Sequence, residues 1–368
     1  MTTLIAYLRA RAFQRGLTLS EFRRLGLAAK SASQARSFVG GYGAARLALR
    51  INRMSNRRGL VADKLLFGAT LAGAGLRGAE IHAVFGRPGP PGIRQIQAAD
   101  DLRAMLNELE DLPLFGKPLM GQREGGEIAI FGYDDQTDEI LTVDGDPVPL
   151  PEFWTMLQDH HCAGGYLFQP FLKQHPDLVH RVGPVLATVR VVTLYNGDAA
   201  QLYRAFWKVP MGDGVTDHPR AGNAAAAVDL KSGRIGSVYS DPTGNRQRLE
   251  THPDTGAVLD ALYIPHWPKV CDLVLQASGL FYGLPLIGWD VAICPEGPVI
   301  VEANTNPLLE LPQYLDGTGA LAGPGGDELR KLLRRSDRAR RKGRLARRRR
   351  RWDLVRGRLG LKRSPTQL

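Results

Sequence analysis

Hydrophobic residues recur at helical spacing at the start of the chain. In SEFRRLGLAAKSASQARSFV and AARLALRINRM, apolar residues stand three and four positions apart, which is the period of an amphipathic helix. We therefore expect a basic helical region over residues 1–58. Ser20 is the predicted start of one helix, and no glutamate stands three residues after it to form a capping box.

Residues 59–112 predict a small α/β portion. VADKLLFGATLAGAG and DLRAMLNELEDL have helical spacing, and the run EIHAVFG between them resembles a short strand. The turn-rich segment GRPGPPG at 86–92 interrupts regular structure, because proline and glycine break both helices and strands.

From residue 113 the chain predicts mainly strands. PLFGKPL, GEIAIFGY, EILTVDG and GYLFQPFL are short apolar runs, and EFWTMLQDHH is the one helical run among them. VLATVRVVTLYNG and AAQLYRAFWKVP predict a hairpin that turns at Asn196-Gly197. A second hairpin is expected to turn at Lys231-Ser232-Gly233. After the helical run KVCDLVLQASGLF come two more strands, PLIGWDVAI and PVIVEAN. The pattern favours largely antiparallel sheets over repeated β–α–β units.

Charge is concentrated at the two ends of the chain. Residues 1–58 carry 12 Lys and Arg against Glu21, and residues 330–363 carry 18 against two aspartates. The whole chain is +11, so the remainder carries −16. An acidic body is a poor groove for nucleic acid.

Composition and cysteine usage indicate a globular protein of a reducing compartment. The 368 residues suffice for two or three modules. Cys162, Cys271 and Cys294 are far apart and form no CxxC pair, so we expect buried, inert thiols. No apolar run is long enough for a signal peptide or a membrane-spanning helix, and we expect a cytoplasmic protein.

Oxygen ligands recur in the last pair of predicted strands. Folding PLIGWDVAICPEGPVIVEANTNP about CPEGP places Asp290 across from Glu302 and Asn304, which share one face because they are two residues apart. Two carboxylates and an amide are ligands suited to Mg²⁺ rather than to zinc. The alternative is an edge hairpin with acids on its wet face.

This run resembles the metal-binding signature that closes the ATP-grasp superfamily, in which an Asp on one strand precedes an E-x-N on the next. The resemblance implies that Asp290, Glu302 and Asn304 hold Mg²⁺ against the phosphates of ATP. EANTNP is similar to the form in D-alanine–D-alanine ligases, where an arginine stands two residues before the Asp. Here that position is Gly288, so we expect Arg190, in ATVRVVT, to supply the missing cation.

A lysine and several glycines follow the first predicted strand of this region. FGKPLMGQREGG supplies Lys117, Gly121, Gly125 and Gly126, and glycines let backbone N–H groups close over a phosphate. No GK[ST] makes it a Walker loop, and an ordinary hairpin turn is the alternative. The resemblance implies that Lys117 and this loop bind ATP phosphates. It points to Lys64 as a second lysine that binds the nucleotide. The alternative is that Lys64 is a solvated lysine on the surface of a helix.

GYLFQPFLKQHP resembles the hinge against which the superfamily binds adenine, and Gln169, Phe171 and Leu172 match that position. The alternative is a buried strand ending at Lys173. Lys208 and Asn223 fall where the superfamily places a lysine and an asparagine near phosphate or substrate. Each could equally have a structural role.

Over residues 60–315 the chain is most similar to the sugar-transfer-associated ATP-grasp proteins and their α-L-glutamate ligase relatives. This resemblance implies an α/β fold with two α+β lobes, over 113–172 and 173–315, that clamp ATP. It implies an ATP- and Mg²⁺-dependent carboxylate–amine ligase that forms an acyl phosphate, acting on a small-molecule or glycan-linked substrate in polysaccharide or peptide modification. The alternative is a catalytically silent ATP-binding module of polysaccharide assembly that its basic ends hold at a membrane surface.

The C-terminal tail over 316–368 predicts either a basic helix or a disordered arm. Its segment 330–363 suits an anionic membrane surface, which would place the protein at the inner membrane face, or an acidic partner. Nucleic acid suits it less, because apart from Trp352 no aromatic side chain interleaves the charges. A solvated arm is the remaining interpretation.

Overall fold

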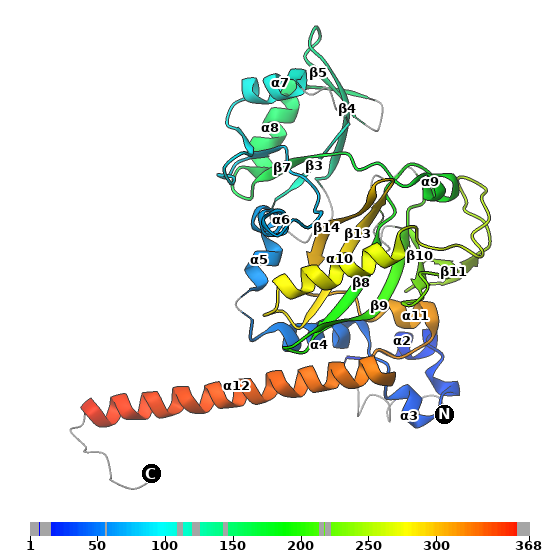
Figure 1. Ribbon diagram of the computed structural model, residues 1–368, viewed down its shortest axis with the longest axis vertical. Coiled ribbons are helices and arrows are strands. Elements are labelled where there is room, and N and C mark those ends of the chain that lie inside the picture. Colours follow the sequence, from blue (N-terminus) through cyan, green and yellow to red (C-terminus); the bar gives the residue numbers. More distant parts are fainter. Residues whose placement is uncertain are drawn as a thin grey trace.

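The computed structural model describes residues 7, 16–55, 57–108, 113–119, 126–142, 146–212, 217 and 222–358, with side chains up to residue 347. Two lobes, each built on one sheet, stand one above the other, and a long helix runs from the lower lobe past the body (Figure 1). Within this described part, no helix combines the length and the apolar character needed to cross a membrane.

The larger sheet has seven strands in the order β12-β11-β10-β9-β8-β13-β14, and every neighbouring pair is antiparallel. Its strands are β8 (Val189–Tyr195), β9 (Ala200–Val209), β10 (Ala224–Val228), β11 (Ile235–Ser240), β12 (Gln247–Leu249), β13 (Leu286–Cys294) and β14 (Gly297–Asn304). The predicted hairpins β8–β9, β10–β11 and β13–β14 are confirmed.

The smaller sheet also has seven strands, in the order β2-β1-β7-β3-β4-β5-β6, and only β1 and β2 run parallel. Its strands are β1 (Ala83–Phe85), β2 (Arg94–Ile96), β3 (Leu114–Pro118), β4 (Ile128–Asp134), β5 (Glu139–Thr142), β6 (Pro147–Pro149) and β7 (Tyr166–Pro170). The pair β1–β2 comes from the stretch predicted as a separate α/β portion, and β1 joins the later strands by pairing with β7.

Helices cover both sheets. They are α2 (Leu19–Arg24), the 3₁₀ helix η1 (Leu27–Ala29), α3 (Ala32–Ala35), α4 (Gly41–Asn52), α5 (Arg58–Ala62), α6 (Lys64–Gly73), α7 (Ala99–Glu108), α8 (Leu150–His161), α9 (Pro176–Val182), α10 (Trp267–Leu280), α11 (Leu311–Asp316) and α12 (Gly323–Arg358). Helices α7 and α8 share an apolar core with the smaller sheet, and α10 crosses one face of the larger one (Figure 1).

The two faces of the larger sheet follow the strand period of two. On β8, Val189 and Val191 pack in the core with α10, whereas Val192 and Leu194 pack against α4 and α12. Arg190 therefore lies on the face away from α10. On β13 the same alternation puts Leu286 and Asp290 on that face, since the odd-numbered positions belong to the α10 core.

The two lobes meet where the chain after α6 passes between the sheets. The Ala79 N–H donates to the Ile300 carbonyl on β14, and the His82 N–H donates to the Phe168 carbonyl on β7. Because backbone hydrogen bonds join this segment to both sheets, it fixes the smaller sheet beside the outer edge of the larger one.

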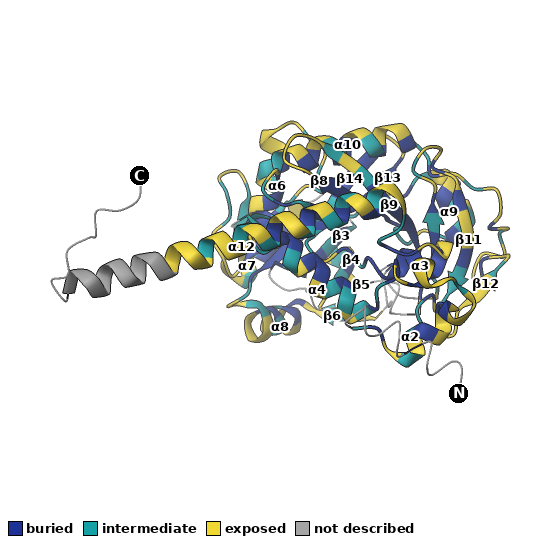
Figure 2. Ribbon diagram, turned by 90° about the horizontal axis from the view of Figure 1, so that it is seen from below, coloured by how far each residue is buried: buried dark blue, intermediate teal, exposed yellow. Residues whose placement is uncertain are grey.

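Three expectations need correction or completion. The N-cap of helix α2 is Thr18 and its first helical residue is Leu19, so the predicted start at Ser20 is wrong, and Glu21 completes a capping box with Thr18. Of the three thiols expected to be buried, Cys294 is buried, whereas Cys271 is half-buried and Cys162, which follows the end of α8, is exposed. Of the two forms expected for the tail, the helix is observed (Figure 2).

Candidate active site

The predicted pair of acids lies across the β13–β14 ladder. Asp290 is the register partner of Glu302, and Asn304 pairs with Gly288. The geometry expected from the turn at CPEGP is thus confirmed. The two side chains differ in environment: Asp290 is 4% exposed and Glu302 is 40% exposed. Asn304 Nδ2 donates to Glu302 Oε1 over 2.8 Å.

Two buried cations engage Asp290. Arg190 is its register partner on β8, and its Nε donates to Asp290 Oδ1 over 2.6 Å while its Nη2 donates to Oδ2. From β9, Lys208 Nζ reaches the same Oδ2 at 3.2 Å. Arg190 Nη2 also lies 3.6 Å from Glu302 Oε1. Both oxygens of Asp290 are therefore bonded to cations.

The ionised states of this cluster support one another. Burial by itself raises the pKa of Asp290, but Arg190 and Lys208 outweigh it and hold that pKa well below its usual range. Burial lowers the pKa values of the two cations, yet Asp290 raises that of Arg190, and Asp217 with Asp290 raises that of Lys208. All three side chains are charged at neutral pH.

Asp217 is a member of the cluster that the sequence analysis did not single out. It is buried, and it accepts from Lys208 Nζ over 3.1 Å and from the Thr188 backbone N–H over 2.6 Å. The Thr188 hydroxyl also donates to it. No periodic pattern marks Asp217, but the lysine in the apolar strand RAFWKVP was a signal, because a buried cation needs an acidic partner.

Gly288 makes room for Arg190. A Cβ built on Gly288 would lie 3.2 Å from Arg190 Cδ and 2.6 Å from Pro307 Cβ. A side chain at this position would therefore collide with Pro307 and crowd the stem of Arg190. The guanidinium beside Asp290 comes from the neighbouring strand, and position 288 has no space for a second one.

Two lysines approach from the opposite side, one from the smaller sheet and one from helix α6. Lys117 on β3 is buried, and burial lowers its pKa to about 8 against the attraction of Glu302. Lys64 on α6 donates to the Pro118 carbonyl over 2.8 Å, and burial lowers its pKa as well. Both line a cavity of about 10 Å³ between the lobes, together with Gln169 and Val301; it holds about one water molecule.

The predicted hinge residues occupy the border of the two lobes. Gln169 is buried and its Nε2 donates to the Ala79 carbonyl over 3.3 Å. Phe171 lies against Phe131 of β4, with ring centroids 5.7 Å apart. Leu172 packs with Ala292, which is two residues beyond Asp290 on the same face of β13. The segment from Gln169 to Leu172 thus runs from the smaller sheet to the face of β13 that carries Asp290.

The remaining predicted residues are only partly described. The Gly126 carbonyl accepts from the Tyr166 hydroxyl over 2.7 Å, and φ is +88° at this glycine. Gly121 and Gly125 lie outside the described residues. Asn223 is buried, and its side-chain oxygen accepts from the Met211 N–H over 2.7 Å, so in this structure it supports the backbone after β9.

The donor atoms of Asp290, Glu302 and Asn304 fit Mg²⁺ by their chemistry, since all three can offer oxygen. They are not equally available: Glu302 and Asn304 face outward, whereas Asp290 is bonded to Arg190 and Lys208. In the described part of the chain, no group of three or more His, Cys, Asp or Glu side chains is arranged to hold a metal. The candidate set has two carboxylates and an amide.

Sequence comparison identifies one family. The model described as sugar-transfer associated ATP-grasp matches residues 43–323, which include both sheets and the charged cluster. No curated protein matches the chain.

Solved structures of similar shape include several ligases. A D-alanine–D-alanine ligase from Coxiella burnetii is 12% identical with a TM-score of 0.41, and the match covers 78% of this chain and 61% of that one. One from Bacillus anthracis is 13% identical with a TM-score of 0.43, over 93% and 94%. An L-amino acid ligase from Bacillus licheniformis is 11% identical with a TM-score of 0.37, over 67% and 41%. This chain thus spans about three fifths of the length of the first.

Proposed function

Because the chain belongs to the sugar-transfer associated ATP-grasp family, we propose that it binds ATP with Mg²⁺ and uses it to join a carboxylate to an amine. The observation that carries the proposal is the buried cluster of Arg190, Lys208 and Asp290, which faces Lys117 across the border of the two sheets. Buried cations next to carboxylates are the groups that a transferring phosphoryl needs.

In the proposed reaction, an oxygen of the substrate carboxylate attacks the γ-phosphorus of ATP. The bond from that phosphorus to the β–γ bridging oxygen breaks, ADP leaves and an acyl phosphate forms. The amine then attacks the acyl carbon, inorganic phosphate leaves, and the proton of the amine passes to solvent. The description of the family as sugar-transfer associated favours an acid or amine carried on a glycan.

The chain's part in this reaction is to position groups and to neutralise charge. Arg190 and Lys208 are proposed to exchange the oxygens of Asp290 for phosphate oxygens when nucleotide binds. Lys117 approaches from the other lobe, where it is buried, and this burial lowers its pKa to about 8. Gln169, Phe171 and Leu172 are proposed to line the adenine pocket.

Glu302 and Asn304, together with Asp290, would hold the metal, and of the two carboxylates Glu302 is the more accessible because its side chain is 40% exposed. When bound, Mg²⁺ supplies positive charge to the phosphates and to these carboxylates. Gly288 leaves Arg190 as the arginine nearest to Asp290, so we propose Arg190 for the role that the ligases give to an arginine two residues before the Asp.

Calorimetry tests the nucleotide site. Wild type is titrated with ATP in Mg²⁺ and in EDTA, beside Glu302→Ala and the control Glu296→Ala, which changes an exposed acid in the turn of the same hairpin. We expect Mg²⁺-dependent binding that Glu302→Ala loses and Glu296→Ala keeps. Binding of equal strength by all three proteins would remove Glu302 from the site.

ADP release tests the chemistry. With panels of acids and amines, wild type should release ADP only when both are present, and Glu302→Gln should stop turnover without unfolding the protein. Full activity in that variant contradicts the proposal.

A second function is favoured by the pairing of Arg190. Two of its nitrogens are held by Asp290, and a guanidinium that stays there stabilises no phosphoryl group. The protein would then be a silent ATP-binding module of polysaccharide assembly. This alternative expects Mg²⁺-dependent ATP binding in calorimetry, together with no ADP release for any acid and amine.

A further inference from the structure

Helix α12 is longer than its attachment to the body requires. Its 36 residues span about 54 Å. Leu329 and Leu332 pack into a core with α4, and Asp337 binds Arg50 and Arg53. Beyond these contacts the helix continues past the body into solvent (Figures 1 and 2), and residues 344–347 are all exposed.

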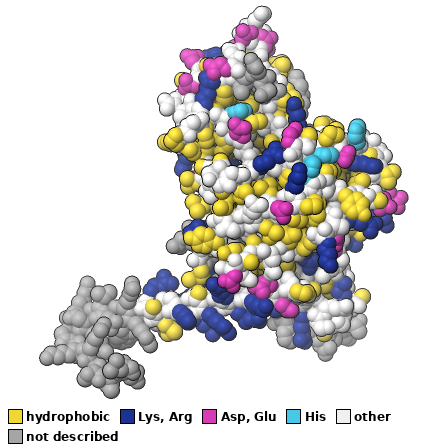
Figure 3. Space-filling model, viewed as in Figure 1, with side chains coloured by type: hydrophobic (Ala, Val, Ile, Leu, Met, Phe, Trp, Pro, Cys, Tyr) yellow, Lys and Arg dark blue, Asp and Glu magenta, His cyan; other side chains and the backbone are white. Residues whose placement is uncertain are grey.

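Lysine and arginine side chains predominate on the described part of this helix (Figure 3). The exposed cations between residues 331 and 347 are Lys331, Arg334, Arg335, Arg338, Arg340, Arg341, Lys342, Arg344 and Arg347. The acids of the helix up to residue 347 are already paired, Asp327 with Arg330, Glu328 with Lys331 and Asp337 with α4. The positive charges therefore exceed the negative ones by a wide margin.

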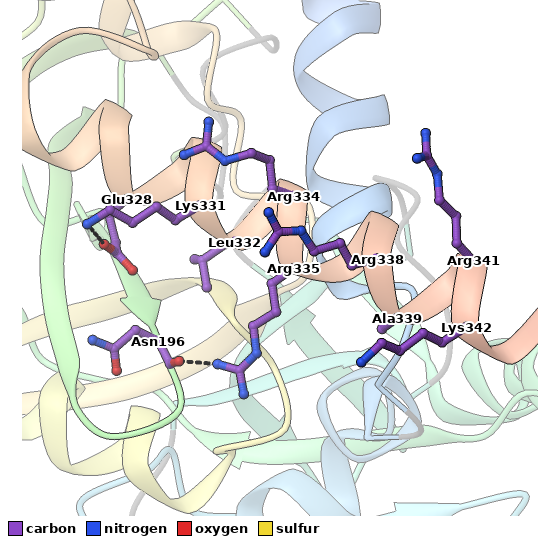
Figure 4. Close-up of a pocket in the computed structure, with 10 residues that line it drawn as sticks. All are labelled: Asn196, Glu328, Lys331, Leu332, Arg334, Arg335, Arg338, Ala339, Arg341 and Lys342. Atoms are coloured by element: carbon purple, nitrogen blue, oxygen red, sulfur yellow. Dashed lines mark hydrogen bonds and ion pairs between the residues drawn. The ribbon is translucent and has the colours of Figure 1, made fainter. Parts of the chain in front are cut away.

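One stripe of these cations has no partner within the described part of the chain. Arg334, Arg338, Arg341 and Lys342 follow each other at helical spacing and share one side of α12. They line a groove of about 720 Å³ beside the β8–β9 turn, where Arg335 reaches the Asn196 carbonyl (Figure 4). The four side chains make no hydrogen bond or ion pair to another described residue.

Like charges at this density repel one another along the helix. The charge of Arg344, followed by burial, lowers the pKa of the Arg340 guanidinium from its usual value. Such a helix loses stability from its own charges, and an external surface of negative charge would relieve the repulsion.

Helix α4, which packs against the first turns of α12, carries exposed apolar side chains of its own. On its outer stripe, Tyr42 is 68% exposed and Leu49 is 57% exposed, and the exposed Arg46 stands between them. Leu345, on α12, is 60% exposed. Phosphates of nucleic acid are contacted through cations and polar groups, whereas exposed aromatic and aliphatic side chains among cations gain free energy at a lipid interface.

We propose that the face formed by α4 and α12 docks on an anionic lipid bilayer. The cations of α12 contact lipid phosphates, and Tyr42, Leu49 and Leu345 enter the headgroup region. Both helices lie along the lower side of the body, whereas the smaller sheet with Lys117 stands on the far side of the larger one (Figure 1). The proposal stands apart from the proposed function, because none of these residues belongs to the charged cluster.

Vesicle flotation of the full chain tests the electrostatic part. Vesicles of phosphatidylglycerol mixed with phosphatidylcholine are compared with phosphatidylcholine alone. Wild type should bind only the anionic vesicles. Each basic residue near such a surface contributes about a fivefold gain in binding, so the variant R334Q/R338Q/R341Q/K342Q should bind several-hundred-fold more weakly.

The matched control removes the same charge elsewhere. The variant K231Q/R234Q/R248Q/K269Q changes four exposed cations of the β10–β12 and α10 region and should bind like wild type. Equal losses in both quadruple variants would show that net charge alone drives binding, and the docking face would be refuted. Circular dichroism of each variant verifies that the fold is retained.

The apolar part is tested with Tyr42→Ser combined with Leu49→Gln. This variant should bind anionic vesicles at least about tenfold more weakly, and the loss should persist at raised salt, because burial of apolar area is not screened. Unchanged binding overturns the insertion of α4. Binding to a fluorescent DNA duplex of random sequence, measured by anisotropy at the same ionic strength, tests the alternative ligand. Duplex binding without vesicle binding would make the face a nucleic-acid surface and overturn the proposal.

Discussion

Replacing Asp290 by Asn should strongly destabilise the protein, since two buried cations lose their shared partner. Asn keeps the shape of the side chain but removes its charge. Among the described residues, Lys208 retains Asp217 at 3.1 Å, whereas the ion pair left to Arg190 is with Glu302, at 3.6 Å and 40% exposed. Most of the lost stability therefore comes from the buried charge of Arg190, which is left poorly paired.

The magnitude follows from the burial of the pair. Removing one partner of a buried ion pair costs about 3–5 kcal/mol in the free energy of unfolding, since an uncompensated charge remains. The contact to half-exposed Glu302 returns about 1 kcal/mol at most. Arg190→Gln should cost a similar amount, because among the described cations it leaves Asp290 bonded only to Lys208. The double variant removes both charges and should cost much less than the sum, with a coupling of about 3 kcal/mol.

Urea unfolding measures this coupling, and the fluorescence of Trp207 and Trp289, both fully buried in the larger sheet, reports the transition. The control cycle uses Arg94 and Glu108, an exposed ion pair of the smaller lobe, for which we expect about 1 kcal/mol or less. If the cost of the double variant equals the sum of the costs of Asp290→Asn and Arg190→Gln to within about 0.5 kcal/mol, Arg190 and Asp290 are not energetically coupled.

Further predictions concern the same cluster. The pKa of Lys117 is lowered to about 8, and a bound phosphate should raise it again. Calorimetry near pH 8 in buffers of different ionisation heat should therefore show proton uptake when ATP binds, and Lys117→Met should abolish that uptake. Because this pKa is lowered, burial of charged Lys117 reduces the free energy of unfolding by its full amount below pH 8, and the reduction disappears as the pH rises toward 10.5. Lys117→Met should therefore make the free energy of unfolding depend less on pH between 8 and 10.5. Gly288→Ala should cost about 1–3 kcal/mol in urea unfolding through the clash with Pro307, and Gly288→Arg should not raise ADP release. Removal of Mg²⁺ by EDTA should weaken ATP binding to wild type more than to Asp290→Asn, since that variant leaves two cations free for phosphate.

The strands were predictable because their signals are local. Alternation of apolar residues and turn pairs such as Asn196-Gly197 act within a few positions, so the hairpins and the register of Asp290 against Glu302 followed from the sequence. Even here local signals can compete: Thr18 and Ser20 are both good capping residues, and Glu21 decides between them.

The ion pairs of the cluster were not predictable in the same way. Arg190 and Asp290 are separated by 100 positions, and their contact depends on how β8 and β13 pair. Asp217 comes from a loop whose acids look alike in sequence. The tail posed a different problem, because its charges repel each other and favour an arm, while Leu329, Leu332 and Asp337 attach its first turns to the body and so support a helix.

The balance of charge in the cluster explains why nucleotide and metal should bind together. In the part of the chain that the structure describes, the cations near the border of the lobes are Lys64, Lys117, Arg190 and Lys208, and the acids that influence them are Glu127, Asp217, Asp290 and Glu302. A balanced cluster can be buried without any ligand, since each charge has a counter-charge. The phosphates of ATP bring further negative charge into this balance, and the described side chains of the cluster hold no surplus positive charge to neutralise it. If ATP bound alone, its phosphates would take Arg190 and Lys208 from Asp290 and leave that carboxylate buried without a counter-charge. A divalent cation that enters with the nucleotide would give Asp290 a new partner in place of Arg190 and Lys208.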